Sequence, residues 1–458
     1  MAQPPSAKSV PPLVPASADP FLAASSEVLG GMRGRFARIA RDPWRVISIL
    51  IILAASGYAL GYLLDVSCIS NGWIAPDNYE HLCYSDIPAL YGIRGFAEGA
   101  IPYVQIPSSG TPLEYPVLTG LFMWVASLIT SLVSGWIYNN DSTRAFFDVN
   151  VILLTPFLLI TVIASALAAG RRVWDAAMIA VAPLLILGAT INWDLIPVAL
   201  TALAFLNWTR NKPQWAGVFL GCAIAAKFYP VVLLAVLIII ALRSRQWRPT
   251  LVAIGATAIT WLLINLPFAI ANFDGWFHFY AFNSARGMDF GSFWYAITLW
   301  GAPAVPAEAL NAAGALTFLA LMVVIVILTL RSPVAPTAFQ LGFLVIAAFA
   351  ISGKVYSPQY VLWLIPFAVL AHPRWRDFLT WQAGQLIYFA AIWWHLAAYG
   401  FDDAKGLHAG WYAAATFIQI GSTLWFAALI IRDMYRQVDY VSATASKVEV
   451  VKRTSAAR

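Results

Sequence analysis

The feature that most constrains this chain is the repetition of long apolar segments along most of its length. Of its 458 residues, 60% are hydrophobic and only 11% are charged. A typical soluble domain is about 25% charged. Runs of about 18 or more apolar residues can span a lipid bilayer. Backbone that faces lipid must make its hydrogen bonds within its own segment, which favours helices. The sequence therefore predicts an all-α polytopic membrane protein.

The apolar segments define the expected domain organisation. They lie near residues 46–64, 117–135, 147–170, 174–191, 195–208, 214–226, 229–242, 250–271, 308–330, 336–351, 358–371, 379–399 and 411–431. Several are short, so we predict about twelve spans in all. The expected transmembrane domain covers 45–432, between a disordered, basic tail at 1–44 and a second tail at 433–458.

Basic residues predict the orientation in the membrane, because loops rich in Lys and Arg favour the cytoplasmic side. Five arginines stand directly before the first apolar segment: Arg33, Arg35, Arg38, Arg41 and Arg45. We therefore expect both tails in the cytoplasm. The long loops at 65–116 and 272–307 are then expected on the outer face of the cell membrane.

The count of spans contains one inconsistency. If 117–135 and 147–170 both cross the membrane, Arg171 and Arg172 face outward. Counting back from the C-terminus puts these two arginines in the cytoplasm. Either one of the two segments is re-entrant or a boundary is misplaced.

Two of the three cysteines share the first outer loop. Cys68 and Cys83 either form a disulfide, if this loop lies outside the cytoplasm, or remain two free thiols. Cys222 lies in an apolar segment, where a cysteine usually packs as a small hydrophobe.

One carboxylate stands in the same loop, among apolar and aromatic neighbours. Asp86 lies in CYSDIPALYG, after Ser85. An acid before Ile-Pro could cap a helix or a turn. The functional alternative is a general base at the membrane face, where burial raises a carboxyl pKa and nearby cations lower it.

Two further acids have both a structural and a functional interpretation. Glu114 precedes Tyr115 and a proline at the start of an apolar segment, and could cap that helix or belong to a site. Asp194, in INWDLIP, could cap the next helix or line a polar cavity. We treat Glu114, Tyr115 and Asp194 as candidates for substrate binding.

Cations and other polar groups stand at the ends of apolar segments that we expect to face outward. Lys227 could either extend to the interface or approach a lipid-linked phosphate. Arg286 and Lys354 are the other candidates for phosphate binding, since a guanidinium in particular matches phosphate geometry. Asp289 is a candidate for substrate binding. His278 is either a packed interfacial histidine or a further substrate-binding residue.

Motifs of several other chemistries are missing from the sequence. It contains no P-loop, GxGxxG, HExxH or CxxC. Asp402 and Asp403 are adjacent, unlike the D-x-D pair that binds metal in soluble nucleotide-sugar transferases. We therefore expect neither a cofactor nor a metal. The net charge of +6 needs no nucleic-acid partner, because the basic residues stand mostly in short loops and tails.

An ordered set of short motifs resembles a known family. The motifs are CYSDIPALYG, LEYPVLTG, RRVWDAA, NWDLIPVALTALAF, AGVFLGCAIAAKFYP, WLLINLP, RGMDFGSFWY and KVYSPQY. In this order they are similar to actinobacterial membrane glycosyltransferases of family 87. The resemblance covers residues 45–432, and although each motif alone is weak, the ordered set is specific.

The resemblance implies a fold and an activity. Family members resemble the C-type membrane glycosyltransferases (GT-C fold), whose active site lies at the extracytoplasmic face. They transfer mannose, with inversion, from polyprenyl-phosphate mannose to phosphatidylinositol mannosides or lipoglycans. By this resemblance Asp86 matches the catalytic base, the donor is a polyprenyl-phosphate sugar, and the acceptor is a glycolipid or lipoglycan of the cell envelope.

The residues agree with this class of chemistry. An inverting single displacement needs only one carboxylate base, whereas glycoside hydrolases use two carboxylates. A lipid-linked donor needs membrane lipids around it and cations near its phosphate. Two alternatives remain: a lipid-linked sugar flippase or transporter, which predicts an internal repeat, and a protein O-mannosyltransferase with the same donor and a peptide acceptor.

Overall fold

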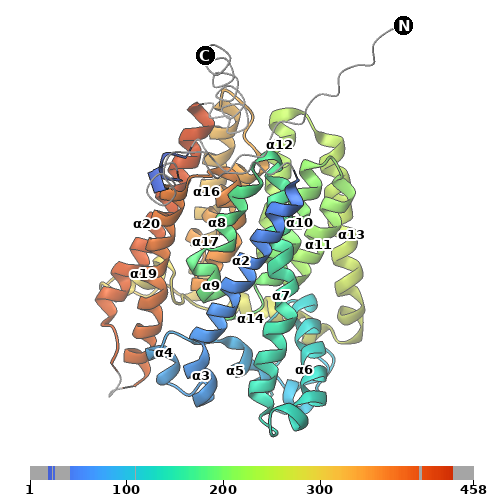
Figure 1. Ribbon diagram of the computed structural model, residues 1–458, viewed down its shortest axis with the longest axis vertical. Helices are drawn as coiled ribbons and strands as arrows, with labels where there is room; N and C mark the ends of the chain where they lie inside the picture. Colours follow the sequence, from blue (N-terminus) through green and yellow to red (C-terminus); the bar gives the residue numbers. More distant parts are fainter. Residues whose placement is uncertain (1–18, 23, 26–41, 109, 402–404, 437–458) are drawn as a thin grey trace.

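The computed structural model of the chain is a bundle of helices, with no strand in the residues that it describes: 19–22, 24–25, 42–108, 110–401 and 405–436. The long helices run side by side along the vertical axis of Figure 1. The start of α2 (Pro43–Leu64) and the end of α20 (Ala409–Arg436) both lie at the upper end. The described residues do not include the arginines that precede Pro43, most of both tails, or Asp402 and Asp403.

The elements between α2 and α20 are long helices and short helical turns. In chain order they are α3 (Val66–Asn71), α4 (Asp77–Glu80), α5 (Asp86–Ile93), η1 (Phe96–Glu98), α6 (Val117–Ile137), α7 (Ser142–Ala168), η2 (Gly170–Ala176), α8 (Ala177–Ala180), α9 (Pro183–Gly188), α10 (Leu195–Thr209), α11 (Pro213–Ala226), η3 (Tyr229–Val232), α12 (Leu233–Ser244), α13 (Trp247–Ala271), α14 (Phe273–Ala285), α15 (Phe293–Leu299), α16 (Ala307–Arg331), α17 (Ala338–Ser352), η4 (Pro358–Tyr360), α18 (Val361–Ala371) and α19 (Trp375–Gly400).

Most of the predicted apolar segments form helices. The prediction of a single apolar segment at 174–191 is wrong, because this part of the chain is not one continuous helix. It is divided among η2, α8 and α9. Pro183 stands at the first turn of α9. A proline lacks the amide hydrogen that a continuing helix needs, and it disfavours helical backbone at the residue before it. The helix therefore ends and starts again at this point.

The last helix, α20, continues to Arg436, a few residues past the predicted end of the transmembrane domain at 432. Asp433 is buried there, 2.5 Å from Nδ1 of His372, which is itself buried. The other ring nitrogen of His372 lies 2.8 Å from Oδ2 of Asp377 on α19. This buried network joins the turn before α19 to the last turns of α20, which extends the folded unit beyond the predicted boundary.

Six helices in the described part of the chain are long and apolar enough to cross a membrane. They are Pro43–Asn71, Val117–Ile137, Ser142–Ala168, Trp247–Ala271, Ala307–Arg331 and Ala409–Arg436. Five further apolar helices are shorter. The chain is thus a multi-pass, all-helical membrane protein, while the count of about twelve spans remains a prediction.

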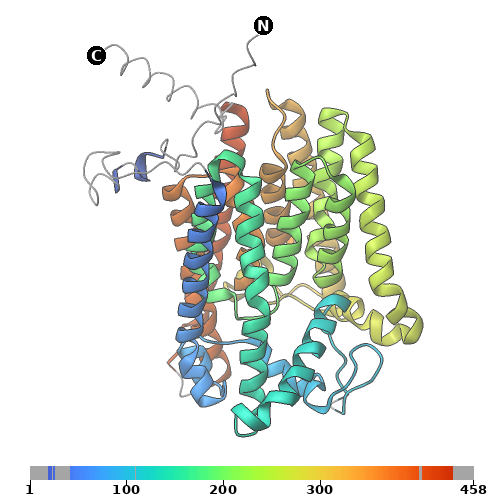
Figure 2. The ribbon, with the colours of Figure 1, turned by 45° about the vertical axis from the view of Figure 1, so that its right-hand side comes forward.

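The position of α6 removes the inconsistency in the count of spans. Figures 1 and 2 both show α6 beside the lower part of α7 only, whereas α7 continues toward the upper end. At its start, Thr119 donates a hydrogen bond of 2.6 Å to the carbonyl of Ala226, the last residue of α11. We infer that α6 does not cross the bundle, so the turn that carries Arg171 and Arg172 lies at the same end as the start of α2.

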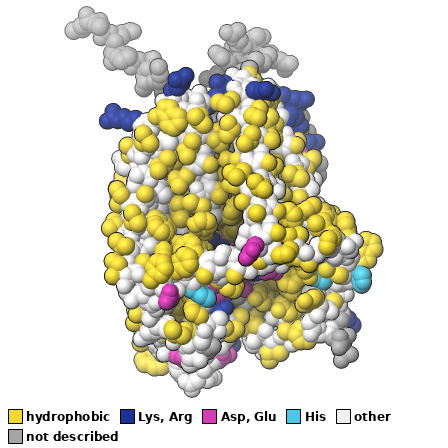
Figure 3. All heavy atoms as spheres, turned by 180° about the vertical axis from the view of Figure 1, so that it is seen from behind, with side chains coloured by type: hydrophobic (Ala, Val, Ile, Leu, Met, Phe, Trp, Pro, Cys, Tyr) yellow, Lys and Arg dark blue, Asp and Glu magenta, His cyan; other side chains and the backbone are white. Residues whose placement is uncertain are grey.

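Charged side chains are distributed unevenly between the two ends. On the face shown in Figure 3, Lys and Arg gather at the upper end, and Asp, Glu and His lie in the lower part. The excess of basic residues at one end is the pattern expected of a cytoplasmic surface. It agrees with the predicted orientation, in which the lower end faces outward.

Cysteine labelling should place the α6–α7 turn on the outer side. A Cβ at Gly135 meets only Asn140 Oδ1, at 3.6 Å, so Gly135→Cys should be tolerated. In a Cys222→Ser background, an impermeant maleimide should label Gly135→Cys in intact cells. Exposed Gln214, at the start of α11, is the matched control, since Gln214→Cys should react only after permeabilisation. If both variants were equally protected from the reagent in intact cells, the result would show that α6 crosses the membrane as a full span.

Candidate active site

A disulfide fastens the first long loop to the end of the first spanning helix. Cys68, on α3, is bonded to Cys83. Of the two alternatives that the sequence leaves open, a disulfide or two free thiols, the structure has the disulfide. Cys222 is a free thiol. Closing a loop of this size stabilises a fold by about 3 kcal/mol in the chain-entropy model.

Hydrogen bonds to the α9–α10 connection fix the start of α5. Ser85 is the N-cap of α5 and accepts a hydrogen bond from the amide of Ile87. The same hydroxyl donates to the carbonyl of Thr190 at 2.7 Å. The amide of Asp86 donates to the carbonyl of Ile191, also at 2.7 Å. Figure 1 shows α5 in the lower part of the bundle.

Two tyrosine hydroxyls hold the carboxylate of Asp86. Tyr84 donates to Oδ1 at 2.8 Å, and Tyr115 donates to Oδ2 at 3.5 Å. Because Ser85 caps the helix, the helix-cap interpretation of Asp86 is wrong. The side chain is half-buried. Its Oδ2 has the weaker of the two hydrogen bonds, so this oxygen is the more available to a substrate.

The surroundings of Asp86 raise the pKa of its carboxyl group. Burial is the largest cause, and the charges of Asp194 and Glu114 act in the same direction. The hydrogen bond from Tyr84 and the charge of Lys227 lower the pKa but do not cancel the rise. The Asp86 charge and burial in turn raise the pKa of Tyr84, so this phenol keeps its proton and remains a donor.

Lys227 and Asp194 form a buried ion pair beside this carboxylate. Nζ of Lys227 lies 2.8 Å from Oδ1 of Asp194, whose side chain is fully buried. The same oxygen accepts a hydrogen bond from the indole of Trp363 at 2.9 Å. Asp194 makes no side-chain cap to α10, so its cap interpretation is wrong and it lines the interior instead.

Aromatic rings surround the Lys227 ammonium. It lies 5.5 Å from the ring centre of Tyr115, 5.8 Å from that of Trp363 and 5.9 Å from that of Tyr360. Such distances are typical of cation–π contacts. The rings of Tyr360 and Trp363 are stacked, with centres 3.8 Å apart. Lys227 is therefore enclosed in the bundle, and the interpretation as a side chain that only extends to the interface is wrong.

Glu114 is held by an arginine that the sequence analysis did not single out. Nε of Arg94 donates to one carboxylate oxygen at 2.5 Å, and its NH2 donates to the other at 2.7 Å. Both side chains are mostly buried. Glu114 does not cap α6, whose N-cap is Pro116. This two-point pair fixes the segment that carries Tyr115 against the end of α5.

Arg286 and Asp289 form an ion pair in the connection between α14 and α15. Although burial opposes the charge of Arg286, the charge of Asp289 and its hydrogen bond raise the pKa of Arg286. The connection that carries this pair bonds to Tyr356, whose ring stacks on that of Tyr360, one of the rings that enclose Lys227. The guanidinium is about one third exposed (37%), so it remains open to a ligand.

The α14–α15 connection is held against the segment after α17. The amide of Asp289 donates to the carbonyl of Lys354 at 2.8 Å, and the amide of Tyr356 donates to that of Phe290 at 3.2 Å. Gly291 has a φ of +76°, and a Cβ there would clash with the carbonyl of Tyr356. Only glycine suits this left-handed position in such close contact.

Lys354 lies next to Arg286 without a carboxylate of its own among the described residues. Its Nζ donates to Oδ1 of Asn311 at 2.6 Å and to the carbonyl of Ser284 at 3.2 Å. Burial and the charge of Arg286 lower the pKa of Lys354. A lysine whose positive charge is disfavoured by a neighbouring arginine provides a natural place for an anion.

The structure thus brings most of the predicted site residues together. A series of contacts, which passes through the stacked rings of Tyr360 and Tyr356, connects Asp86, Tyr115, Lys227, Asp194, Arg286, Asp289 and Lys354. We call this series the charged site. His278 is not part of it, and the ring contact that the structure shows for it is with Phe282, at 6.2 Å.

Sequence reasoning missed several residues that complete the charged site. Tyr84 stands next to Ser85 in the motif that carries Asp86, and aromatic residues beside an isolated acid were the available signal. Tyr360 and Trp363 follow Lys354 in SPQYVLW, but nothing in their spacing showed that they enclose Lys227. Arg94 carried no distinguishing signal.

Comparison with known proteins identifies the family. The model of glycosyltransferase family 87 matches residues 113–353, which is more than half of the chain. The match includes Asp194, Lys227 and Arg286 but ends before Lys354, and it begins after Asp86. A search of curated proteins finds no match. On the evidence of the family model and of its apolar helices, the chain belongs to glycosyltransferase family 87 and is a membrane glycosyltransferase.

Proposed function

We propose that the chain transfers mannose, with inversion, from a polyprenyl-phosphate donor to a glycolipid or lipoglycan of the cell envelope. We further propose a C-type fold in the cell membrane, with the charged site on the extracytoplasmic side. The sequence motifs that resemble family 87 support the donor and acceptor classes. The basic upper end and the position of the charged site in the lower part support the orientation.

Asp86 is the general base of this proposal. Its Oδ1 is held by Tyr84, while Oδ2 has only the long contact with Tyr115 and takes the proton of the acceptor hydroxyl. The acceptor oxygen then attacks C1 of the donor sugar from the side opposite the phosphate. The bond between C1 and the phosphate oxygen breaks, and the polyprenyl phosphate leaves with the electron pair.

Arg286 and Lys354 bind the leaving phosphate in this proposal, and Lys227 adds its positive charge from within the aromatic rings. The support is that Arg286 is partly exposed and that Lys354 has only neutral partners among the described residues. Preorganised cations stabilise the charge that develops on a leaving phosphate. Asp289 and Asp194 then hold Arg286 and Lys227 in position.

The observation that carries the proposal is a half-buried carboxylate that has no cationic partner among the described residues and lies in one site with three cations. An inverting transfer needs this combination of one base and a cationic cradle. The flippase or transporter alternative loses its basis, because the chain belongs to a glycosyltransferase family. No contact in the described structure favours a peptide acceptor.

A comparison of donors tests the function directly. The purified full chain, in nanodiscs with a membrane extract as acceptor source, should transfer radiolabelled mannose from polyprenyl-phosphate mannose. It should transfer none from GDP-mannose in the absence of polyprenyl phosphate, because the proposed donor is a lipid-linked monophosphate and not a nucleotide sugar. Transfer from the nucleotide sugar alone would contradict the proposed donor.

The pH dependence of transfer should reveal the raised pKa of Asp86. The base acts only when deprotonated, so kcat/KM should rise with pH through that pKa. The acid limb of the pH–rate profile should lie above pH 4, because the usual pKa of an aspartate side chain is about 4 and that of Asp86 is raised. Tyr84→Phe removes a hydroxyl that lowers this pKa, so its acid limb should move to higher pH than that of the wild type. A shift to lower pH in Tyr84→Phe would contradict the assignment.

A further inference from the structure

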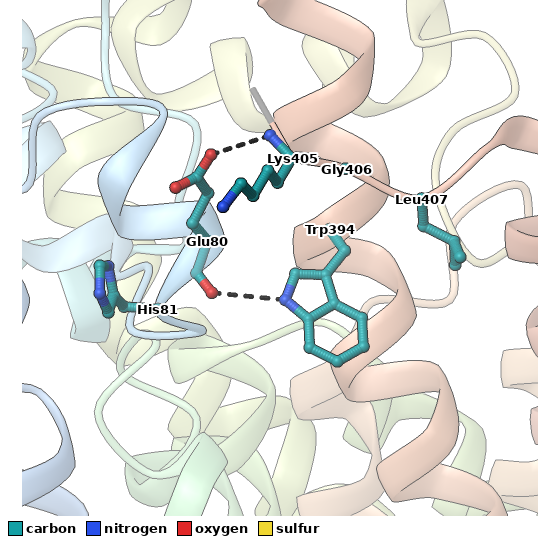
Figure 4. Close-up of a pocket in the computed structure, with 6 residues that line it drawn as sticks. All are labelled: Glu80, His81, Trp394, Lys405, Gly406 and Leu407. Carbon is teal, nitrogen blue, oxygen red and sulfur yellow. Dashed lines mark hydrogen bonds between the residues drawn. The ribbon is translucent and has the colours of Figure 1, made fainter. Parts of the chain in front are cut away.

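A pocket lies outside the charged site, between α4 and the last turns of α19. Its volume is about 470 Å³, and it is lined by Glu80, His81, Trp394, Lys405, Gly406 and Leu407. Figure 4 shows the side chain of Glu80 pointing toward the backbone of Lys405, and its carbonyl facing the indole of Trp394. A pocket of this size is large enough for a small ligand.

Hydrogen bonds build this pocket from segments that are far apart in the sequence. The carboxylate of Glu80 accepts a hydrogen bond from the Lys405 amide at 3.0 Å, through Oε1. The Glu80 carbonyl accepts one from the Trp394 indole at 3.3 Å. The amide of Leu407 donates to the carbonyl of Trp394 at 2.9 Å, and Gly406 packs so closely on α19 that a Cβ would clash with Ala398. The pocket is therefore a formed site and not a gap between loose segments.

The lining favours a neutral molecule with many hydroxyl groups. Trp394 is 41% exposed and offers an aromatic surface, on which the apolar face of a sugar ring can stack. Glu80 offers an acceptor, and Oε2 of this carboxylate has no hydrogen bond among the described residues. Lys405 and His81 offer donors. Because the pocket carries charges of both signs, an ionic ligand would meet repulsion as well as attraction.

A row of aromatic rings connects this pocket to Asp86. Tyr79, the neighbour of Glu80 on α4, stacks on Tyr84 with ring centres 5.6 Å apart. Both rings also lie against Trp393, at 6.4 Å and 4.9 Å. Tyr84 in turn donates the hydrogen bond to Asp86. The pocket and the carboxylate thus lie at the two ends of one aromatic surface.

We propose that this pocket binds a neutral sugar unit of the acceptor, set back along its glycan from the unit that reacts at Asp86. The proposal rests on the proposed function for the nature of the molecule that carries the glycan. It predicts that the enzyme prefers an acceptor with several sugar units over one with a single unit. The pocket contributes to the binding of the acceptor and takes no part in the transfer step.

Binding of free oligosaccharides tests the pocket without any transfer. The probes are mannotetraose and maltotetraose, observed by saturation-transfer difference NMR with the full chain in nanodiscs. Wild-type protein should bind at least one of them, and Trp394→Ala should weaken that binding by about tenfold, which corresponds to about 1.4 kcal/mol. Trp394→Phe keeps an aromatic ring and should bind within about threefold of wild type. Glu80→Gln keeps the acceptor for the Lys405 amide and should cause a smaller loss than Trp394→Ala.

Kinetics provide the second measurement. With a multi-sugar acceptor, Trp394→Ala should raise the acceptor KM and leave kcat and the donor KM unchanged. With octyl mannoside, which cannot reach the pocket from Asp86, it should change nothing. Trp411→Ala is the matched control, because Trp411 is a 71% exposed tryptophan on α20 outside the pocket.

The outcomes separate the pocket from the proposed function. No binding of either tetrasaccharide by wild-type protein, or equal binding by Trp394→Ala, would overturn the pocket assignment even if transfer is observed. Asp86→Asn should lower transfer by about 10²–10⁴-fold and keep tetrasaccharide binding. If no sugar is transferred from polyprenyl-phosphate mannose but binding depends on Trp394, the pocket assignment stands and the donor assignment fails.

Discussion

Replacing Asp86 with asparagine should lower the rate of sugar transfer by about 10²–10⁴-fold, the usual contribution of a general base. The amide has the shape of the carboxylate and can still accept the hydrogen bond from Tyr84, but it cannot take a proton from the acceptor. The variant should therefore insert and bind the donor normally. The measurement is single-turnover transfer by the purified variant with polyprenyl-phosphate mannose.

A second acid of the same loop provides the control for this result. Glu98 is exposed and contacts Ser108, away from the charged site, so Glu98→Gln should transfer sugar within about threefold of wild type. Glu114 is a poor substitute for the base, because Arg94 binds both of its oxygens. Transfer by Asp86→Asn within a few-fold of wild type would show that its carboxylate has only a structural role.

Removing either cation of the proposed phosphate site should lower kcat by about 10²–10³-fold, the usual effect of losing one preorganised charge donor. Lys354→Met is the cleaner variant, since Lys354 has no carboxylate partner among the described residues. Arg286→Ala also leaves the Asp289 carboxylate without its ion-pair partner. Comparison with the double variant Arg286→Ala/Asp289→Asn separates the loss of the cation from the effect of the unpaired carboxylate. The measurements are kcat and the donor KM in steady-state transfer.

The two cations should act as a unit. If both bind one phosphate, the double variant Lys354→Met/Arg286→Ala should lose less than the sum of the two single effects in free energy. Lys212→Met, at an exposed turn between α10 and α11, is the matched control and should have no effect. Wild-type donor kinetics in both single variants would exclude these residues from the phosphate site.

The sequence predicted most of the helices and several site residues. It did not predict how far each helix extends across the bundle or which charged side chains form pairs. Hydropathy located the apolar helices closely, as the prediction of 308–330 for α16 illustrates. It could not show that α6 lies along the lower part of the bundle, because an apolar segment has the same composition whether it crosses a membrane or lies beside it. Only tertiary packing distinguishes the two cases.

The same limit applies to the charged site. Asp86 was visible as an isolated acid, and the cations were visible as charges at helix ends. The choice of partners was not visible, since Lys227 and Asp194 belong to different helices and meet only when α10 and α11 pack together. Residue type reveals which groups can pair, whereas the fold decides which groups do.

The ion pairs of the charged site have a consequence for its electric field. Two pairs, Lys227–Asp194 and Arg286–Asp289, each join one cation to one carboxylate, so they contribute almost no net charge. Two charges remain without an ionic partner among the described residues, at the ends of the series of contacts: Asp86 and Lys354. The result is a field that points from the lysine toward the aspartate. In the proposed reaction, negative charge moves from the acceptor oxygen to the leaving phosphate, which is the direction that this field assists. A donor bound in reverse would set its phosphate against a carboxylate, so the polarity of the site favours a single orientation of the bound donor.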